Sequence, residues 1–271
     1  MTVIEEIPYS RAVPSALGGW INRSAPVLCV FAAIFAGWEL AVRTLGIPDF
    51  ILPSPSAIVI KIVLSWQLLL WNAFVTLQEI LLGFGLSVAV AIPLAIAVVY
   101  SGIFERVAFP FMVSLQTIPK VALAPILVMW LGYGIMPKVM VAFLISFFPI
   151  VINSVIGMRS AEKEMIYLVQ SMGAGELTTF IKIRLPKALP SIFGGLKVGM
   201  GQAVVGATVG EFIAAENGLG YLQLISQVRL DTPLLFAAVV VLSILGVLLF
   251  NIVGLVERLA LPWSRVATQS E

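Results

Sequence analysis

The sequence contains no histidine, a single cysteine (Cys29) and few charged residues, which make up only 11% of the 271 positions. Without histidine, the chain lacks the side chain that most often shuttles protons and binds metal ions in enzymes. A single cysteine cannot form a disulfide within the chain, so it says nothing about the redox compartment. Soluble domains carry charge on about a quarter of their residues. The scarcity of charge, together with 60% hydrophobic residues, therefore predicts an integral membrane protein.

Further absences exclude several classes of site. No Gly-x-x-x-x-Gly-Lys-Ser/Thr pattern for binding phosphate occurs, so we expect any ATP hydrolysis to take place on a separate protein. The acidic and hydroxyl residues form no cluster of the kind that supports catalysis or binds a metal. We therefore predict no catalytic residue, no metal and no cofactor. The formal net charge of +2 is too small to favour nucleic acid as a partner.

Six apolar segments are each long enough to cross a membrane, because about 20 helical residues span a hydrocarbon core of about 30 Å. Only a short turn separates the third from the fourth, which predicts a helical hairpin. We predict an all-α membrane protein with one transmembrane domain over residues 25–265, between an N-terminal segment (1–24) and a short tail (266–271). The expected spans cover residues 25–45, 75–100, 107–131, 136–158, 188–214 and 233–257.

Two connections between the spans are long. Residues 46–74 include Pro48, Pro53 and Pro55 and then a moderately apolar stretch that is too short to span, so we expect a helix at the membrane interface. Residues 215–232 have helical character but too little apolar length to span. They predict either a re-entrant or surface helix on the outer side, or simply a long connection.

Lysine and arginine predict the orientation, since they are enriched in cytoplasmic loops. An even number of spans places both termini, the 102–106 turn and the 159–187 loop on one side. That side holds ten of the sixteen lysine and arginine residues, whereas the other holds four, namely Arg43, Lys61, Lys138 and Arg229. We therefore expect both termini and the 159–187 loop to be cytoplasmic.

The 159–187 loop is rich in charge and in helix-forming residues, and Gly173-Ala174-Gly175 interrupts it. Glycine can adopt a positive φ, so Gly173 permits a sharp bend between two short helices. The following segment, 176–183, predicts a short amphipathic helix that Leu185-Pro186 ends. Such a helix could rest on the membrane or insert into a groove of a partner. A solvated helical hairpin without a partner fits the residues equally well.

Gly173 and the Leu185-Pro186 pair, whose proline lies thirteen residues after the glycine, resemble the cytoplasmic signature loop of ABC importer permeases. The Glu-Ala-Ala that usually opens this signature is not kept, because Tyr167-Leu168-Val169 stands in its place. Other stretches are similar to the nitrate, sulfonate and taurine branch of these permeases, which also includes uptake permeases for pyrimidine precursors and riboflavin. They are Leu52-Pro53-Ser54-Pro55, Thr117-Ile118-Pro119-Lys120-Val121-Ala122-Leu123-Ala124-Pro125, Trp130-Leu131-Gly132 and Gly218-Leu219-Gly220-Tyr221.

This resemblance covers nearly all of residues 50–265 and implies a type I ABC importer permease of the bacterial inner membrane. The implied partners are two ATPase subunits, a second permease copy in a homodimer, an extracytoplasmic solute-binding protein and the lipid bilayer. The implied cargo is a small organic or anionic solute, and the Ile-Pro-Lys of the third span leans toward the pyrimidine-precursor and riboflavin members. The resemblance further implies coupling to the ATPase through Gly173, Ala174, Gly175, Glu176, Leu177, Phe180, Leu185 and Pro186.

Polar residues within the spans are candidates for the translocation path, because a charge in lipid costs several kcal/mol. Lys120 follows Pro119, which should break the helix near mid-membrane, and its ammonium group could attract an anionic or electron-rich solute. Pairing with a carboxylate, or snorkelling, is the alternative for this lysine. Gln202 could bind solute or, more simply, bridge two helices. Glu211 could pair with Lys120 or Lys138, or face the outer gate.

Three other charged positions have simpler interpretations. Glu39 and Arg43 lie one helical turn apart and are expected to pair with each other. Glu79 is expected at the outer membrane interface. Lys197 is expected to snorkel toward the cytoplasmic side.

The fifth span carries two pairs of glycines, each four residues apart on one face, with Ala203 and Ala207 between them. Small residues let membrane helices approach closely. This face could pack against another helix of the same chain, or it could line a dimer interface or the translocation path. The pairs are Gly195 with Gly199 and Gly206 with Gly210.

A stand-alone secondary transporter or channel is the main alternative to a permease subunit. It predicts internal repeats and ionisable residues paired at mid-membrane for ion coupling, and the sequence shows no convincing repeat. A membrane enzyme would need a cluster of catalytic side chains, and none is evident.

Overall fold

The computed structural model describes residues 16–262, and every regular element in that range is a helix. The expected tail at 266–271 and the first fifteen residues of the expected N-terminal segment lie outside the described residues. In chain order the helices are α1 (Ala16–Thr44), α2 (Pro55–Leu64), α3 (Trp66–Tyr100), η1 (Phe104–Ala108), α4 (Phe109–Leu115), η2 (Lys120–Leu123), α5 (Ala124–Leu131), α6 (Ile135–Arg159), α7 (Lys163–Ser171), α8 (Glu176–Thr179), η3 (Phe180–Arg184), α9 (Leu185–Ala214), α10 (Leu219–Val228) and α11 (Thr232–Ala260).

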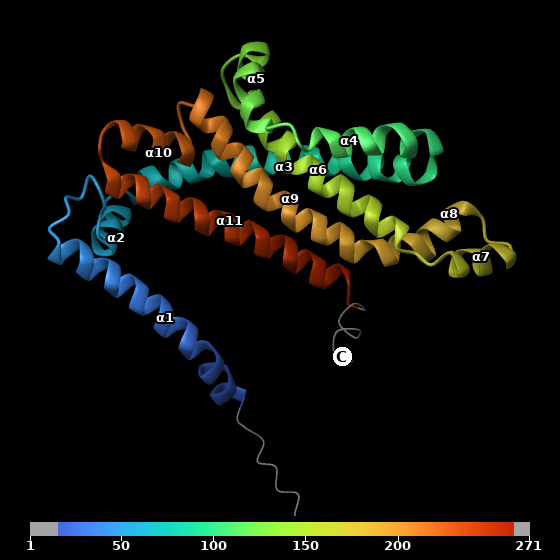
Figure 1. Ribbon diagram of the computed structural model, residues 1–271, viewed down its shortest axis with the longest axis horizontal. Helices are drawn as coiled ribbons and strands as arrows, with labels where there is room; N and C mark the ends of the chain where they lie inside the picture. The colour runs from blue at the N-terminus through green and yellow to red at the C-terminus, as the bar shows by residue number, and fades with distance from the viewer. Residues whose placement is uncertain (1–15, 263–271) are drawn as a thin grey trace, which may run out of the picture.

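Four long helices, α3, α6, α9 and α11, form the body of the molecule (Figure 1). α6 packs against both α3 and α9, and its residues Ile150, Val151 and Val155 are fully buried. α2 and α10 lie at one end of this body, whereas α7 and α8 lie at the other (Figure 1). The two ends are therefore built from the short helices that connect the long ones.

The helices α3, α6 and α9 approach one another closely at Ala142 of α6. A Cβ added to Gly206 of α9 would lie 2.6 Å from the Ala142 Cα, and one added to Gly83 of α3 would lie 2.5 Å from the Ala142 Cβ. Only glycine leaves room for such an approach. Close packing of this kind holds membrane helices together, since lipid provides no hydrophobic drive between them.

Four helical segments in the described part of the chain are long and apolar enough to cross a membrane: α3, α6, the continuous run Glu176–Ala214 and α11. The bent pair Phe104–Leu115 and Lys120–Leu131 would be a fifth if it forms one span. α1, which contains the expected first span, is not among them. The all-α transmembrane fold is confirmed, whereas the predicted count of six spans is not.

The second long helix begins earlier than predicted. α3 starts at Trp66 rather than at residue 75 and runs for 35 residues. No glycine or proline stands between Trp66 and Leu82, so nothing in the sequence interrupts the helix there. The helix expected at the interface within 46–74 is correspondingly short. It is α2, whose N-cap Ser54 accepts a hydrogen bond from the Ala57 amide (3.3 Å).

The third predicted span, 107–131, is not one helix. α4 ends at Leu115, the chain resumes helical structure at Lys120, and the two halves meet at 88°. Pro119 stands at the break, where its missing amide hydrogen prevents the helix from continuing. Figure 1 shows α5 standing out from the body of the molecule. Its buried residue Ala124 packs against Val141 and Ile145 of α6.

The helix expected to end at Leu185-Pro186 instead continues through this pair. Residues Glu176–Ala214 form one helical run, in which Phe180–Arg184 is a π-helical turn and Pro186 falls in the first turn of α9. The Leu185 amide before it donates to the Phe180 carbonyl, five residues earlier, and the proline itself has no amide hydrogen that needs a partner. The π turn before it takes up the change in hydrogen-bonding pattern.

α1 diverges from the other helices and is held at its C-terminal end (Figure 1). Arg43 and Glu39 form the expected pair, 2.6 Å apart. The same Glu39 carboxylate accepts hydrogen bonds from the Ser56 amide (3.0 Å) and hydroxyl (2.7 Å), which ties α1 to α2. Trp38 also contacts Phe236 of α11, with 6.0 Å between ring centroids.

Candidate functional site

The short helices at one end of the molecule form a platform, which we call the 163–184 platform (Figure 1). α7 ends at Ser171, and two residues later the chain bends at Gly173, whose φ is +87°. The Gly173 amide donates to the Gln170 carbonyl (2.9 Å) and the Ala174 amide to the Val169 carbonyl (3.2 Å). A Cβ on Gly173 would meet no atom within 4 Å. The bend therefore needs the backbone freedom of glycine rather than its small size.

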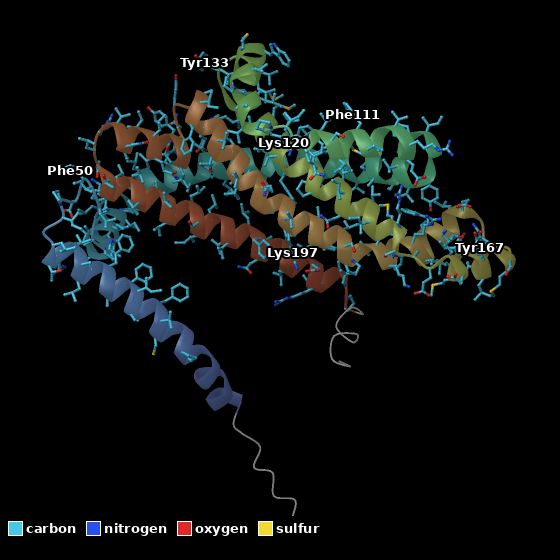
Figure 2. All side chains as sticks on the ribbon, viewed as in Figure 1. Phe50, Phe111, Lys120, Tyr133, Tyr167 and Lys197 are labelled. Carbon is cyan, nitrogen blue, oxygen red and sulfur yellow. The ribbon has the colours of Figure 1, made fainter. Side chains whose placement is uncertain are left out.

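The free side of this platform exposes large apolar side chains. Met172 is 79% exposed, Leu177 71% and Tyr167 66%. Figure 2 shows Tyr167 at the end of the molecule, away from the long helices. Apolar side chains gathered on a charged surface indicate a contact site for another protein or for the membrane.

The other side of the platform is fastened to the long helices. The Phe180 ring meets the Tyr100 ring of α3 edge-on, with 5.8 Å between centroids, and the Arg184 guanidinium lies 5.2 Å from the same ring. Lys187 donates a hydrogen bond to Glu162 (2.6 Å), and this bond with the lysine charge lowers the pKa of the Glu162 carboxyl. Contacts on the platform can therefore act on α3 and α9.

The eight residues expected to couple to an ATPase divide between these two sides. Gly173, Gly175, Glu176 and Leu177 are exposed, whereas Ala174, Phe180, Leu185 and Pro186 are half-buried. Gln170 of α7 donates a hydrogen bond to Glu176 (3.0 Å) and so braces the bend.

The four candidates for a translocation path do not form one site. Lys120 stands at the break after Pro119, half-buried, with its Nζ 4.8 Å from the centre of the Phe148 ring of α6 (Figure 2). Gln202 lies on the exposed face of α9 with Val198 and Val205. Glu211 is buried elsewhere and takes neither of these as its partner.

The glycine face of α9 is occupied within the chain. A Cβ on Gly195 or Gly199 would lie 2.7 Å from Asn153 or Ile150 of α6, and one on Gly210 would lie 2.9 Å from the Lys138 Cα. Together with Gly206 at Ala142, these glycines form the α6–α9 contact. Of the alternatives left open by the sequence, the structure shows packing within the chain.

Three charged residues from three helices meet inside the protein, near the end opposite the platform. Glu79 of α3 and Lys138 of α6 form an ion pair, and both Glu79 and Glu211 of α9 are at most 1% exposed. Glu79 was predicted to lie at the outer membrane interface, and this prediction is wrong because the residue is buried in the core. The sequence held a signal for this, since Asn72, Thr76 and Glu79 recur at helical spacing on one face of α3.

Glu211 also holds the connection between α9 and α10. Its carboxyl group accepts hydrogen bonds from the Thr76 hydroxyl (2.6 Å) and from the Gly220 amide. The Leu219 amide donates to the Thr76 hydroxyl (2.8 Å) and the Gly218 amide to the Asn72 side chain (2.7 Å). The first amides of α10 are thus capped by side chains of α3 and α9.

Lys197 was predicted to snorkel toward the cytoplasmic side, but in the structure it has a partner inside the chain. It forms an ion pair with Glu257, which joins α9 to α11 (Figure 2). The pair is about three-quarters buried, with side-chain exposures of 28% and 23%. In the described residues, 16–262, no group of His, Cys, Asp and Glu side chains is arranged to hold a metal ion.

Long apolar helices, a helical platform at one end and charged residues paired in the interior define a multi-pass membrane transport subunit. Residues 83–261 match the family described as binding-protein-dependent transport system inner membrane component. The chain belongs to this family, and it is a permease subunit of an ABC importer.

Relatives support this assignment over most of the chain. A formylaminopyrimidine transport permease, ThiX of Halalkalibacterium halodurans, is 38% identical over 87% of this chain and 94% of its own length. A riboflavin transport system permease, RibX of Chloroflexus aurantiacus, is 37% identical over 96% of this chain and 98% of its own. A putative aliphatic sulfonates transport permease, SsuC of Escherichia coli, is 30% identical over 90% and 94%.

The fold is also found among solved structures. A chain of the inward-facing methionine ABC transporter MetNI covers 72% of this chain and 96% of its own length, with a TM-score of 0.64 and 17% identity. This likeness confirms the type I importer permease fold.

Proposed function

We propose that two copies of this chain form the translocation path of an importer, with a separate ATPase subunit docked on each 163–184 platform. The observation that carries this proposal is the platform itself. It exposes apolar side chains at a bend that depends on Gly173, and it is joined to α3 and α9 through Tyr100 and Lys187. A partner bound there has a direct mechanical connection to the long helices.

In this proposal, closure of the two ATPase subunits on ATP draws the two platforms together. That movement switches the paired permeases from an inward-open to an outward-open state. ATP shifts the equilibrium toward the outward-open state because it binds that state of the complex more tightly than the inward-open state. A solute-binding protein then delivers the solute to the outer face, and the platform with both termini lies in the cytoplasm.

The pairing surface and the path are expected on the faces that the single chain leaves uncovered. Gln202, Val198 and Val205 lie on such a face of α9, and Lys120 stands at the break between α4 and α5. A broken helix that lines a path is tolerated because its free backbone groups face the cavity rather than lipid. We propose Pro119, Lys120 and Gln202 as contacts of the moving solute.

We further propose that the solute is a planar nitrogen heterocycle of the formylaminopyrimidine or riboflavin type. The relatives named for those solutes are 38% and 37% identical, against 30% for the sulfonate permease. Lys120 lies over Phe148, whose ring is 5.2 Å from Phe147. Aromatic rings beside a cation suit a flat, electron-rich solute.

Purification of the tagged chain from its native host in detergent tests the assembly. We expect an ATPase subunit to co-elute in a one-to-one ratio with the chain. If the chain elutes alone and transports solute in liposomes without ATP, the proposal is wrong and a stand-alone transporter takes its place.

Uptake of labelled formylaminopyrimidine, riboflavin and taurine by cells that lack the chain tests the solute class. Loss of taurine uptake alone would overturn the heterocycle proposal.

A further inference from the structure

The buried cluster of Glu79, Lys138 and Glu211 holds one cation and two carboxyl groups. Their exposures are 0%, 6% and 1%, so all three side chains are almost entirely removed from the surface of this chain. With both carboxyl groups ionised, the cluster would carry an uncompensated negative charge inside the membrane domain. Such a charge costs several kcal/mol unless a proton neutralises it.

The two carboxyl groups also share one buried site, because Glu79 pairs with Lys138 and Glu211 accepts a hydrogen bond from Thr76, one turn before Glu79 on α3. An ionised carboxylate can only accept hydrogen bonds, so the two carboxyl groups can bond to each other only when one of them carries a proton. Neighbouring carboxyl groups in other sites share one proton for the same reason. Among described residues, neither oxygen of Glu79 has a conventional hydrogen-bond partner apart from its ion pair with Lys138. A proton on Glu211 provides the missing donor.

The surrounding groups set the total charge of this site. α10 contributes only its N-terminal amides, from Gly218 to Gly220, and these favour a negative charge on Glu211. Glu216, in the adjoining connection, is exposed. Lys61 and Asp231 pair with each other at 2.6 Å. Lys138, which pairs with Glu79, is therefore the one full cation of this cluster in the described structure, and one shared proton makes the cluster neutral.

The position of Glu211 decides whether the α9–α10 connection stays in place. Gly218 has φ +122°, and a Cβ on Gly218 or Gly220 would collide with the Glu211 carboxyl group. Both glycines of the Gly218-Leu219-Gly220 sequence thus make room for this one side chain. If Glu211 moved away, the Gly220 amide would lose its acceptor and Thr76 would lose its link to α9.

We infer that Glu79 and Glu211 bind one proton between them, and that this proton fastens the α9–α10 connection to α3. Loss of the proton leaves two carboxylates in one buried site, and their repulsion moves Glu211 away from Thr76 and Gly220 and frees residues 215–220. A cavity of about 480 Å³, lined by Tyr133, Lys138, Ala215, Glu216 and Asn217, gives the proton a route to the cluster. The inference stands on these contacts and does not depend on the proposed solute or partners.

Infrared spectroscopy of the purified chain in liposomes tests the proton. The wild type should show a protonated-carboxyl band at neutral pH that disappears at alkaline pH. Glu211→Gln should remove that band at neutral pH, whereas the matched control Glu257→Gln, in the other Glu–Lys pair between helices, should retain it. Absence of the band in the wild type, or its persistence in Glu211→Gln, would overturn the inference.

Hydrogen exchange measured by mass spectrometry tests the fastening. Glutamine at 211 mimics the protonated acid, because its amide can donate to Glu79 while its carbonyl accepts from Gly220. At neutral pD the 215–222 segment should exchange equally slowly in wild type and Glu211→Gln. At alkaline pD it should exchange at least several-fold faster in the wild type than in the variant. Equal rates at every pD would show that no titrating group holds the connection.

Discussion

The guanidinium of Arg184 lies over the ring of Tyr100, with 5.2 Å between its Cζ and the ring centroid, and so joins the start of α9 to the last residue of α3. The same ring receives Phe180 edge-on at 5.8 Å. The first and last residues of the π turn, Phe180 and Arg184, thus contact the same aromatic side chain. A movement of the platform reaches α3 at this point.

Tyr100→Leu should weaken the transfer of movement from the platform to α3. Leucine retains apolar bulk but removes a cation–π contact and an aromatic pair, each worth about 0.5–1.5 kcal/mol. We expect solute transported per ATP hydrolysed to fall about fivefold to tenfold in reconstituted complexes. Trp71→Leu, at a side chain that is 59% exposed near the other end of the same helix, is the control. Equal effects of the two substitutions would contradict this role for Tyr100.

Gly173→Val should abolish coupled transport while the chain still inserts into the membrane. The site has φ +87°, and a β-branched residue there costs about 1–3 kcal/mol although no atom obstructs the side chain. Uptake and ATPase activity are measured together with the amount of chain in the membrane. Gly175→Ala is the matched control, since Gly175 has φ −75° and open space around it. Normal transport by Gly173→Val would show that the bend is not needed for coupling.

Gly206→Val should destabilise the helix bundle by about 3 kcal/mol, because the new side chain meets the Ala142 backbone at 2.6 Å and the helices must separate. Thermal unfolding of the purified chain in detergent measures the change. Gly201→Val, on the same helix with no atom within 4 Å, should leave the midpoint nearly unchanged. A similar loss in both variants would point to the helix backbone rather than to the contact.

Lys120→Met should lower the affinity of the path for its solute without disturbing assembly. The lysine is half-buried at the break and contacts Phe148, so methionine keeps its length and removes only its charge. We expect about a tenfold rise in the solute concentration needed for half-maximal uptake, in line with about 1–2 kcal/mol for a partly desolvated cation–π or charge contact. Lys120→Arg should retain most of the affinity. Unchanged uptake in Lys120→Met would remove this residue from the path.

The Glu162–Lys187 pair should be sensitive to acid. Lys187 lowers the pKa of Glu162, so the pair contributes to stability above the ordinary pKa of a glutamate and loses that contribution as the pH falls through the lowered value. Carbon NMR of labelled glutamate carboxyl groups should show Glu162 titrating below its ordinary range. In Lys187→Gln that titration should move upward. No movement would mean that the pair does not persist in solution.

The apolar runs of the sequence predicted the long helices well wherever a helix is continuous. The spans expected at 136–158 and 233–257 lie inside α6 and α11, because charge, glycine and proline mark both of their ends. The break in the segment 107–131 was predictable from Pro119, but hydropathy measures apolar content and not direction, so it could not give the 88° angle between the two halves. The pair Glu39–Arg43 was predictable because both residues lie on the same helical face.

The buried polar cluster could be predicted only in part. Asn72, Thr76 and Glu79 share one face of α3, which predicts that this face meets something polar. Nothing in the sequence tells which helix brings the partners, since Lys138 and Glu211 come from α6 and α9. For the same reason the sequence offered both Lys120 and Lys138 as partners of Glu211, whereas in the structure Lys138 pairs with Glu79 and Glu211 accepts hydrogen bonds from Thr76 and Gly220. Partner choice across helices depends on packing, and packing depends on contacts such as that of Gly206 with Ala142.

The helical run from Glu176 to Ala214 carries the platform at one end and Glu211 near the other. Each residue of an α-helix turns the chain by about 100°. The direction of each side chain at one end of the run is therefore fixed relative to the other end. Inserting one residue between Pro190 and Gln202 would rotate Glu211 away from Glu79 although no residue had been replaced. The length of this helix is thus constrained as strictly as its composition, and single insertions should be tolerated only in the connections that flank it.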